Sequence, residues 1–169
     1  MKYSTPSPHV DRDDQDVAAH RELRRAFGHF PSGVTVVSYA HGNAIYGITV
    51  SSFTSISLDP PLVLVSLMRS SRASQLLPHV PFTINILAKG QLDLAFQFAG
   101  MNSDPTDVEW DVSGATPRLT DAHAHFVCRP WRTYDGGDHV LVLGEVVDYA
   151  ITDDTDPLVV HQGAWREML

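Results

Sequence analysis

The sequence predicts a mainly β protein with a few short helices, folded as a closed or nearly closed antiparallel barrel. Short β-type runs recur along the chain between turn residues, whereas only a few short stretches show a helical pattern. In addition, residues 62–67 (LVLVSL) are apolar on both faces, which is typical of a central strand. Many short strands with few short helices point to such a barrel.

Length and composition fit a single domain. The 169 residues are 43% hydrophobic and 9% aromatic, which is ordinary for a globular protein with one core. With 12 Lys+Arg against 20 Asp+Glu, the net charge of −8 excludes a general attraction to nucleic acid or to an anionic membrane. A phosphate-bearing ligand would therefore need a local site. The one cysteine, Cys128, rules out an intramolecular disulfide and fits a reducing compartment. Because no apolar run approaches the ~20 residues that span a bilayer and no signal pattern is present, we expect a cytoplasmic protein.

The N-terminal segment, residues 1–15, is expected to be a flexible tail, with residues 16–169 forming the folded domain. The tail carries prolines, small polar residues and an acidic cluster. Asp16 is a candidate cap for a helix that Gly28 ends. The apolar residues near one stripe of this helix are Val17, Leu23, Ala26 and Phe27.

After this helix the pattern changes to β. Residues 34–40 and 44–50 form a predicted hairpin, because Gly42 and Asn43 supply the positive φ angles that its turn needs. We expect the second strand to continue beyond residue 50.

The stretch 47–67 is the segment around which the rest of the chain is organised. It joins a row of hydroxyl side chains to a double-proline turn and then to the central strand. With a period of two, the hydroxyl side chains share one face with Phe53, and the aliphatic side chains share the other, which can reach the core. The two sets are Thr49, Ser51, Ser55 and Ser57 against Ile48, Val50, Ile56 and Leu58. The hydroxyl face suits a polar, planar, anionic ligand, although it also fits the solvated side of a sheet.

The remaining elements follow the same alternation of short strands and helices. We expect helices at 70–77 and 91–98, a strand at 81–87, a loop at 101–117, and strands at 124–131, 139–151 and 157–162.

A basic and hydroxyl cluster comes directly after the central strand. Arg69, Ser70, Ser71 and Arg72 lie at the expected start of a helix, where unpaired amides and the helix dipole favour anions. Arginine also matches the bidentate geometry of phosphate. The cluster is therefore a candidate phosphate site, although a capped surface helix explains the same residues.

Other kinds of site fit less well. His123 and His125 would share one side of a strand, but no carboxylate follows at short spacing, so we expect no metal. A nucleophilic triad is disfavoured because Cys128 lies in a strand-like run and no serine lies in a glycine-flanked elbow. His139 differs, because it follows a glycine turn and its ring can face a pocket at the barrel edge; the alternative is a solvated turn histidine.

Six segments together resemble the flavin reductase-like family, whose members have an FMN-binding split barrel. They are FPSGVTVVS, GITVSSFTSISLDPPLVLVSL, SSR, FTINIL, GDHVLVLGEV and PLVVHQGAW, and the resemblance as a whole covers roughly residues 23–165. More narrowly, the chain is similar to the reductase component of two-component flavin-dependent monooxygenases. The resemblance implies a homodimeric, six-stranded antiparallel split β-barrel with flavin sites at or near the subunit interface.

The resemblance also implies roles for individual residues. For FMN or FAD, the implied binding residues are Thr49, Val50, Ser51, Ser52, Ser66, Arg69, Ser70, Ser71, Arg72, Phe98 and Ala99, with the phosphate at 69–72. His139 matches a position associated with the nicotinamide substrate and is the candidate catalytic residue. Further nicotinamide candidates are Ser32, Gly33, Gly163 and Trp165. The segment 160–165 (VHQGAW) lacks the basic residue that the family often has in this motif, which leaves NADH versus NADPH open.

The implied activity is that of an NAD(P)H:flavin oxidoreductase that supplies reduced flavin to a partner monooxygenase or halogenase. Hydride passes from the nicotinamide to the flavin once the rings stack at about 3–3.5 Å, so the protein needs to orient two flat anionic molecules. Two alternatives remain open. One is a non-catalytic flavin- or haem-binding split-barrel module, and the other is a pyridoxamine phosphate oxidase-like enzyme.

Overall fold

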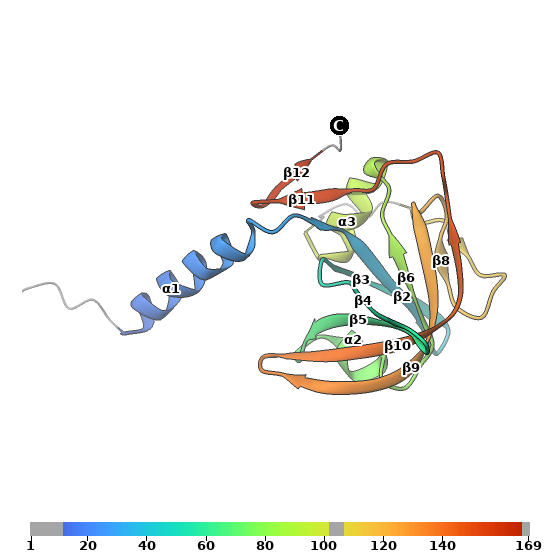
Figure 1. Ribbon diagram of the computed structural model, residues 1–169, viewed down its shortest axis with the longest axis horizontal. Helices are drawn as coiled ribbons and strands as arrows, with labels where there is room; N and C mark the ends of the chain where they lie inside the picture. The colour runs from blue at the N-terminus through green and yellow to red at the C-terminus, as the bar shows by residue number, and fades with distance from the viewer. Residues whose placement is uncertain (1–11, 102–106, 167–169) are drawn as a thin grey trace, which may run out of the picture.

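A seven-stranded antiparallel sheet dominates the computed structural model, which describes residues 12–101 and 107–166. The strand order is β3-β2-β6-β9-β10-β5-β4, and the sheet curls on itself (Figure 1). Its strands are β2 (Thr35–His41), β3 (Ala44–Val50), β4 (Thr54–Leu58), β5 (Pro61–Met68), β6 (Phe82–Ile86), β9 (Ala124–Gly136) and β10 (His139–Ile151). The two edge strands, β3 and β4, are consecutive in the chain, so the curled sheet is split between them.

Smaller elements surround this sheet. A second sheet has the order β1-β11-β12, and β7 pairs with β8. These strands are β1 (Ser32–Gly33), β7 (Trp110–Asp111), β8 (Arg118–Leu119), β11 (Val159–His161) and β12 (Ala164–Arg166). The helices are α1 (Arg12–Phe27), α2 (Arg72–Leu76), the 3₁₀ turn η1 (Lys89–Gln91) and α3 (Leu92–Phe98). No helix in the described part of the chain is long and apolar enough to span a membrane.

The predicted mainly β fold is confirmed, but the expected long strand after the hairpin is divided. Residues 51–53 leave the ladder and separate β3 from β4, which makes seven strands where the resemblance implied six. Ile48 and Val50 pack against the core as predicted. Ile56 and Leu58 do not, since they are 48% and 95% exposed. The reason is that β4 is an edge strand with a register irregularity after Ser55, which breaks the alternation of faces.

Strand β5 lies second from the edge, and its expected central place is wrong. Val63, Val65 and Leu67 are buried on one face, whereas Leu62 and Leu64 on the other face are only half-buried. Strand β2 has both faces covered, because Val36 and Val37 point to opposite sides and enter different apolar clusters. Strand β2 is thus a rigid neighbour for β3.

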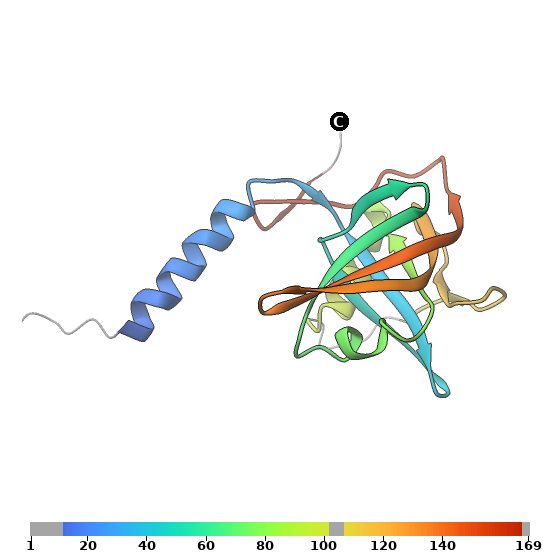
Figure 2. The same cartoon turned by 60° about the horizontal axis from the view of Figure 1, so that its bottom comes forward.

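Helix α1 begins at Arg12, so Asp16 lies inside the helix and does not cap it. Residues 1–11 of the predicted tail lie outside the described chain. Figures 1 and 2 both show α1 extending away from the sheet. Its apolar stripe is correspondingly open, with Val17 50%, Leu23 49% and Phe27 68% exposed.

Candidate functional site

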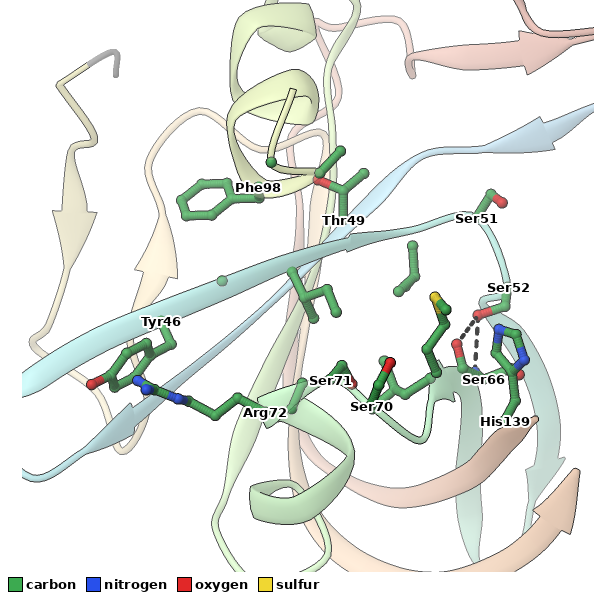
Figure 3. A pocket seen from close by; sticks show the side chains of 18 of the residues that line it. Tyr46, Thr49, Ser51, Ser52, Ser66, Ser70, Ser71, Arg72, Phe98 and His139 are labelled. Atoms are coloured by element: carbon green, nitrogen blue, oxygen red, sulfur yellow. Dashed lines mark hydrogen bonds between the residues drawn. The ribbon is translucent and has the colours of Figure 1, made fainter. Parts of the chain in front are cut away.

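A cavity of about 730 Å³ lies among β3, β5, α2 and the end of α3 (Figure 3). Ligand pockets commonly enclose roughly 300–1,000 Å³, so the cavity can hold a cofactor-sized molecule. The predicted site residues that line it are Thr49, Val50, Ser51, Ser52, Ser66, Ser70, Ser71, Arg72, Phe98, Ala99 and His139. The fold therefore brings the stretch after the hairpin, the cluster after β5, and His139 to one place.

Two of the predicted hydroxyl groups are occupied by bonds within the protein. Ser52 Oγ donates to the Ser66 carbonyl at 3.1 Å and accepts from the Ser66 N–H at 2.9 Å. Thr49 Oγ1 donates to the Ala95 carbonyl at 2.8 Å. These bonds tie the two ends of the cavity wall to β5 and α3, so both side chains shape the site as well as line it.

Arg69 does not line the cavity. Its Nε donates to the Gly137 carbonyl at 2.7 Å, and its Nη2 lies 2.6 Å from Asp135 Oδ1. The Gly137 N–H and the Arg69 guanidinium together lower the pKa of the Asp135 carboxyl. Arg69 therefore holds the β9–β10 turn, away from the place where the sequence put a phosphate.

His139 is oriented by its neighbour Asp138. Its Nδ1 lies 2.7 Å from Asp138 Oδ1, and this hydrogen bond lowers the pKa of the Asp138 carboxyl. The backbone of the same turn is fixed where the Arg69 N–H donates to the Asp138 carbonyl at 3.0 Å. Figure 3 shows the imidazole next to Ser52 and Ser66 at one end of the cavity. The ring is thus held in place beside the wall of the site.

The other end of the cavity holds Arg72. Its Cζ lies 4.9 Å from the centre of the Tyr46 ring, and Figure 3 shows the side chain reaching toward that ring. Within the described residues, no carboxylate forms an ion pair with Arg72. Helix α2 starts at Arg72, later than expected, and Ser71 caps it by accepting from the Ser74 N–H at 3.1 Å. Since α2 has only five residues, any attraction for an anion depends on the Arg72 charge more than on a helix dipole.

Sequence reasoning missed Tyr46 and Gly47, which also line the cavity. Tyr46 pairs with Tyr39 across the hairpin, and their rings stack at 5.6 Å. The hairpin register already implies this pair, so the signal was present in the sequence. Gly47 gives no such signal. A Cβ there would lie 2.5 Å from the Phe98 ring, so glycine lets α3 approach β3 closely.

The predicted nicotinamide residues lie apart from the main cavity, except His139. Ser32 and Gly33 line a cavity of about 470 Å³ that also touches Ser51 and Ser52. Gly163 lines another, of about 250 Å³, together with Ser32 and Ser51. The segment 51–52 therefore separates the main cavity from these two. Trp165 lines none of them and packs edge to face on Phe96 at 5.3 Å.

The residues weighed for other chemistries have structural partners. His123 Nδ1 lies 3.0 Å from Thr155 Oγ1, and His125 Nε2 lies 3.3 Å from Arg118 Nη1. Burial raises the pKa of the Cys128 thiol to about 12, which keeps it neutral. In the part of the chain that the structure describes, no three His, Cys, Asp or Glu side chains gather as a metal site would require.

Known relatives in sequence are reductases. The chain is 42% identical over 135 residues to an NADH-dependent FAD reductase of Streptomyces globisporus, covering 75% of this chain and 73% of the relative. It is 37% identical to an NADH-dependent flavin reductase of a Rhodococcus species, covering 86% and 85%. It is also 39% identical to the reductase component of a 4-nitrophenol monooxygenase of Rhodococcus opacus, covering 84% and 77%.

Solved structures agree in fold. The flavin reductase PheA2 matches with a TM-score of 0.85 at 35% identity, covering 88% of this chain and 97% of the other. The Streptomyces globisporus NADH:FAD oxidoreductase SgcE6, in complex with NAD and FAD fragments, matches with a TM-score of 0.81 at 35% identity, covering 96% and 98%. BorF, the flavin reductase component of a bacterial two-component tryptophan halogenase, matches with a TM-score of 0.77 at 36% identity, covering 87% and 96%. The flavin reductase like domain model matches residues 27–168, and on this evidence the chain belongs to the flavin reductase-like family.

Proposed function

We propose that the chain is an NADH-dependent flavin reductase that reduces FMN or FAD by hydride transfer. The observation that carries the proposal is one cavity that joins the 49–52 wall, an arginine that pairs with no carboxylate of the described residues, and an oriented histidine. The names of the relatives and of the matching structures support the same chemistry. These residues also fit a flavin, because a flat ring system with a phosphate needs a long wall that ends in a cation.

The two ends of the cavity bind different parts of the reacting molecules. Arg72 and the exposed Ser70 bind the flavin phosphate, while the backbone and small side chains of 49–52 lie along the ring system and the ribityl chain. His139 contacts the nicotinamide substrate at the opposite end. The bound flavin supplies the hydride acceptor. The protein's contribution is to align the two molecules and to exclude water from the contact between their rings.

We further propose that reduced flavin leaves the site and serves a separate monooxygenase or halogenase. Arg72 and Ser70 are exposed, and a charge contact in water is weaker than a buried one. Such a site favours exchange of the flavin over permanent retention. The reductase component from Rhodococcus opacus and the structure of BorF support a partner of this kind.

We propose that the protein is a homodimer that uses the apolar surface near this site. The second half of β10 exposes Val147, Tyr149 and Ile151, at 55%, 64% and 62%. A row of rings joins this surface to the site, because Phe53 stacks on Phe126 at 5.6 Å and Phe126 on Tyr149 at 6.5 Å. Phe53 directly follows Ser52 in the cavity wall. A second copy covering this surface would therefore also support the wall of the cavity.

The reductase proposal is tested by mixing the purified protein with NADH and either FMN or FAD and following the absorbance of NADH. We expect NADH loss that depends on both protein and flavin. NADH loss that no flavin stimulates would contradict the proposal. Co-purification of haem would favour the non-catalytic binding module, and oxidation of pyridoxamine phosphate would favour the oxidase-like alternative.

A further inference from the structure

The Tyr46 ring contacts the Arg72 guanidinium at the end of the cavity. Arg72 reaches over this ring from the first residue of α2, with 4.9 Å between its Cζ and the ring centre. Tyr46 is itself fixed, because its ring stacks at 5.6 Å on Tyr39, which is 2% exposed and belongs to the core. A buried tyrosine, a half-buried tyrosine and an exposed arginine thus form one stack from the core to the cavity.

This environment differs from that of three other arginines. Arg69, Arg118 and Arg129 each pair with a carboxylate, whereas Arg72 has no ion pair among the described residues. A carboxylate partner would occupy the N–H groups that a phosphate needs and would repel its charge. An aromatic face attracts a guanidinium while leaving those N–H groups free. In a chain with a net charge of −8, this is a way to keep a cation in place and available to an anion.

We propose that Tyr46 is a positioning residue that presents Arg72 to the phosphate of the flavin. The inference rests on the proposed flavin reductase function and adds to it a determinant of specificity for phosphorylated flavins over riboflavin. Tyr46 acts through Arg72, so its effect depends on the phosphate and on the arginine, and the ring matters more than the hydroxyl.

The test compares dissociation constants of FMN and riboflavin, measured by quenching of flavin fluorescence, for the wild type and for Tyr46→Leu, Tyr46→Phe, Arg72→Ala and the Tyr46→Leu/Arg72→Ala double variant. We expect the wild type to bind FMN more tightly than riboflavin. Tyr46→Leu should reduce that preference by roughly two- to fivefold, the value of an exposed cation–π contact. Tyr46→Phe should keep the wild-type preference for FMN. In the Arg72→Ala background, Tyr46→Leu should not reduce the preference further.

A matched control comes from a second arginine–aromatic contact outside the cavity. Arg132 lies over Trp131 with its Cζ 6.0 Å from the ring centre, so Trp131→Leu removes a similar contact and should leave the FMN preference unchanged. The proposal would be overturned if Tyr46→Leu weakened the binding of FMN and of riboflavin equally. It would also be overturned if Tyr46→Leu reduced the FMN preference in the Arg72→Ala background. A wild type that binds riboflavin as tightly as FMN would overturn it as well. A wild type that prefers FMN but oxidises no NADH would instead contradict the reductase function.

Discussion

At the scale of single residues, a polar side chain is available to a ligand only where the protein itself does not already pair with it. Arg69 and Arg72 look equivalent in sequence, since both follow a strand and flank two serines. In the structure Arg69 pairs with Asp135, 66 residues away, whereas Arg72 lies over Tyr46. The sequence located the cluster but could not separate the two arginines, because the difference arises when the β9–β10 turn folds back. Local patterns carry no information on such a distant contact.

Cys128 offers a prediction at this scale. The thiol is fully buried, and its pKa rises from 9.0 to about 12. We expect a thiol-reactive reagent to modify the native protein at least tenfold more slowly than the urea-unfolded chain, since only the thiolate reacts readily. As the chain has one cysteine, the signal is unambiguous. Equal rates in both states would show that the thiol is accessible.

The same shift gives a dependence of stability on pH. The unfolded thiol loses its proton at a lower pH than the folded one. Rising pH therefore stabilises the unfolded state relative to the folded state. The contribution of Cys128 to stability is therefore complete below pH 9.0 and is lost between there and about 12. Unfolding in urea across this range should show a smaller alkaline loss of stability for Cys128→Ala than for the wild type.

At the scale of elements, the site depends on how the β9–β10 hairpin meets the end of β5. His139 opens β10 and pairs with Met68, the last residue of β5, so the strand ladder brings the histidine to the cavity. The hairpin signal at 42–43 and most strands could be read from the sequence, because turn residues and β-type runs are local. The break at 51–53 and the edge position of β4 could not, since both depend on which strands pair.

Arg69 provides the prediction at this scale. The Arg69 side chain bonds to the turn that carries Asp138 and His139, so Arg69→Ala should weaken the binding of NADH. We expect KM for NADH to rise roughly fivefold, equivalent to about 1 kcal/mol of lost positioning, with the preference for FMN over riboflavin retained. Arg72→Ala should show the reverse pattern. Loss of the FMN preference in Arg69→Ala would instead place this arginine at the phosphate.

At the scale of the whole molecule, the described residues include apolar surfaces that the chain itself does not cover. One is the second half of β10, and another is the stripe of α1, which stands apart from the sheet in Figure 1. The sequence predicted the fold class and the family correctly. It did not predict that the apolar stripe of α1 lies outside the core. An amphipathic pattern is the same whether the stripe packs on its own core or on another subunit.

The dimer proposal is tested at this scale by the molecular mass in solution, from light scattering after gel filtration. Tyr149→Glu places a charge in the β10 surface and should shift the protein from dimer toward monomer. Val112→Glu is the matched control, because Val112 is also 64% exposed but lies outside β10. A wild type that is monomeric at micromolar concentrations, or a dimer that Tyr149→Glu leaves intact, would contradict this interface.

The most direct test of the central claim is anaerobic reduction of FMN by NADH, followed through the visible absorbance of oxidised flavin. Wild-type protein should bleach FMN far faster than NADH does alone. Arg72→Ala should need a higher FMN concentration for the same rate, and the control Arg132→Ala should behave as the wild type. Bleaching no faster than in the absence of protein would contradict the claim that this cavity brings flavin and nicotinamide together.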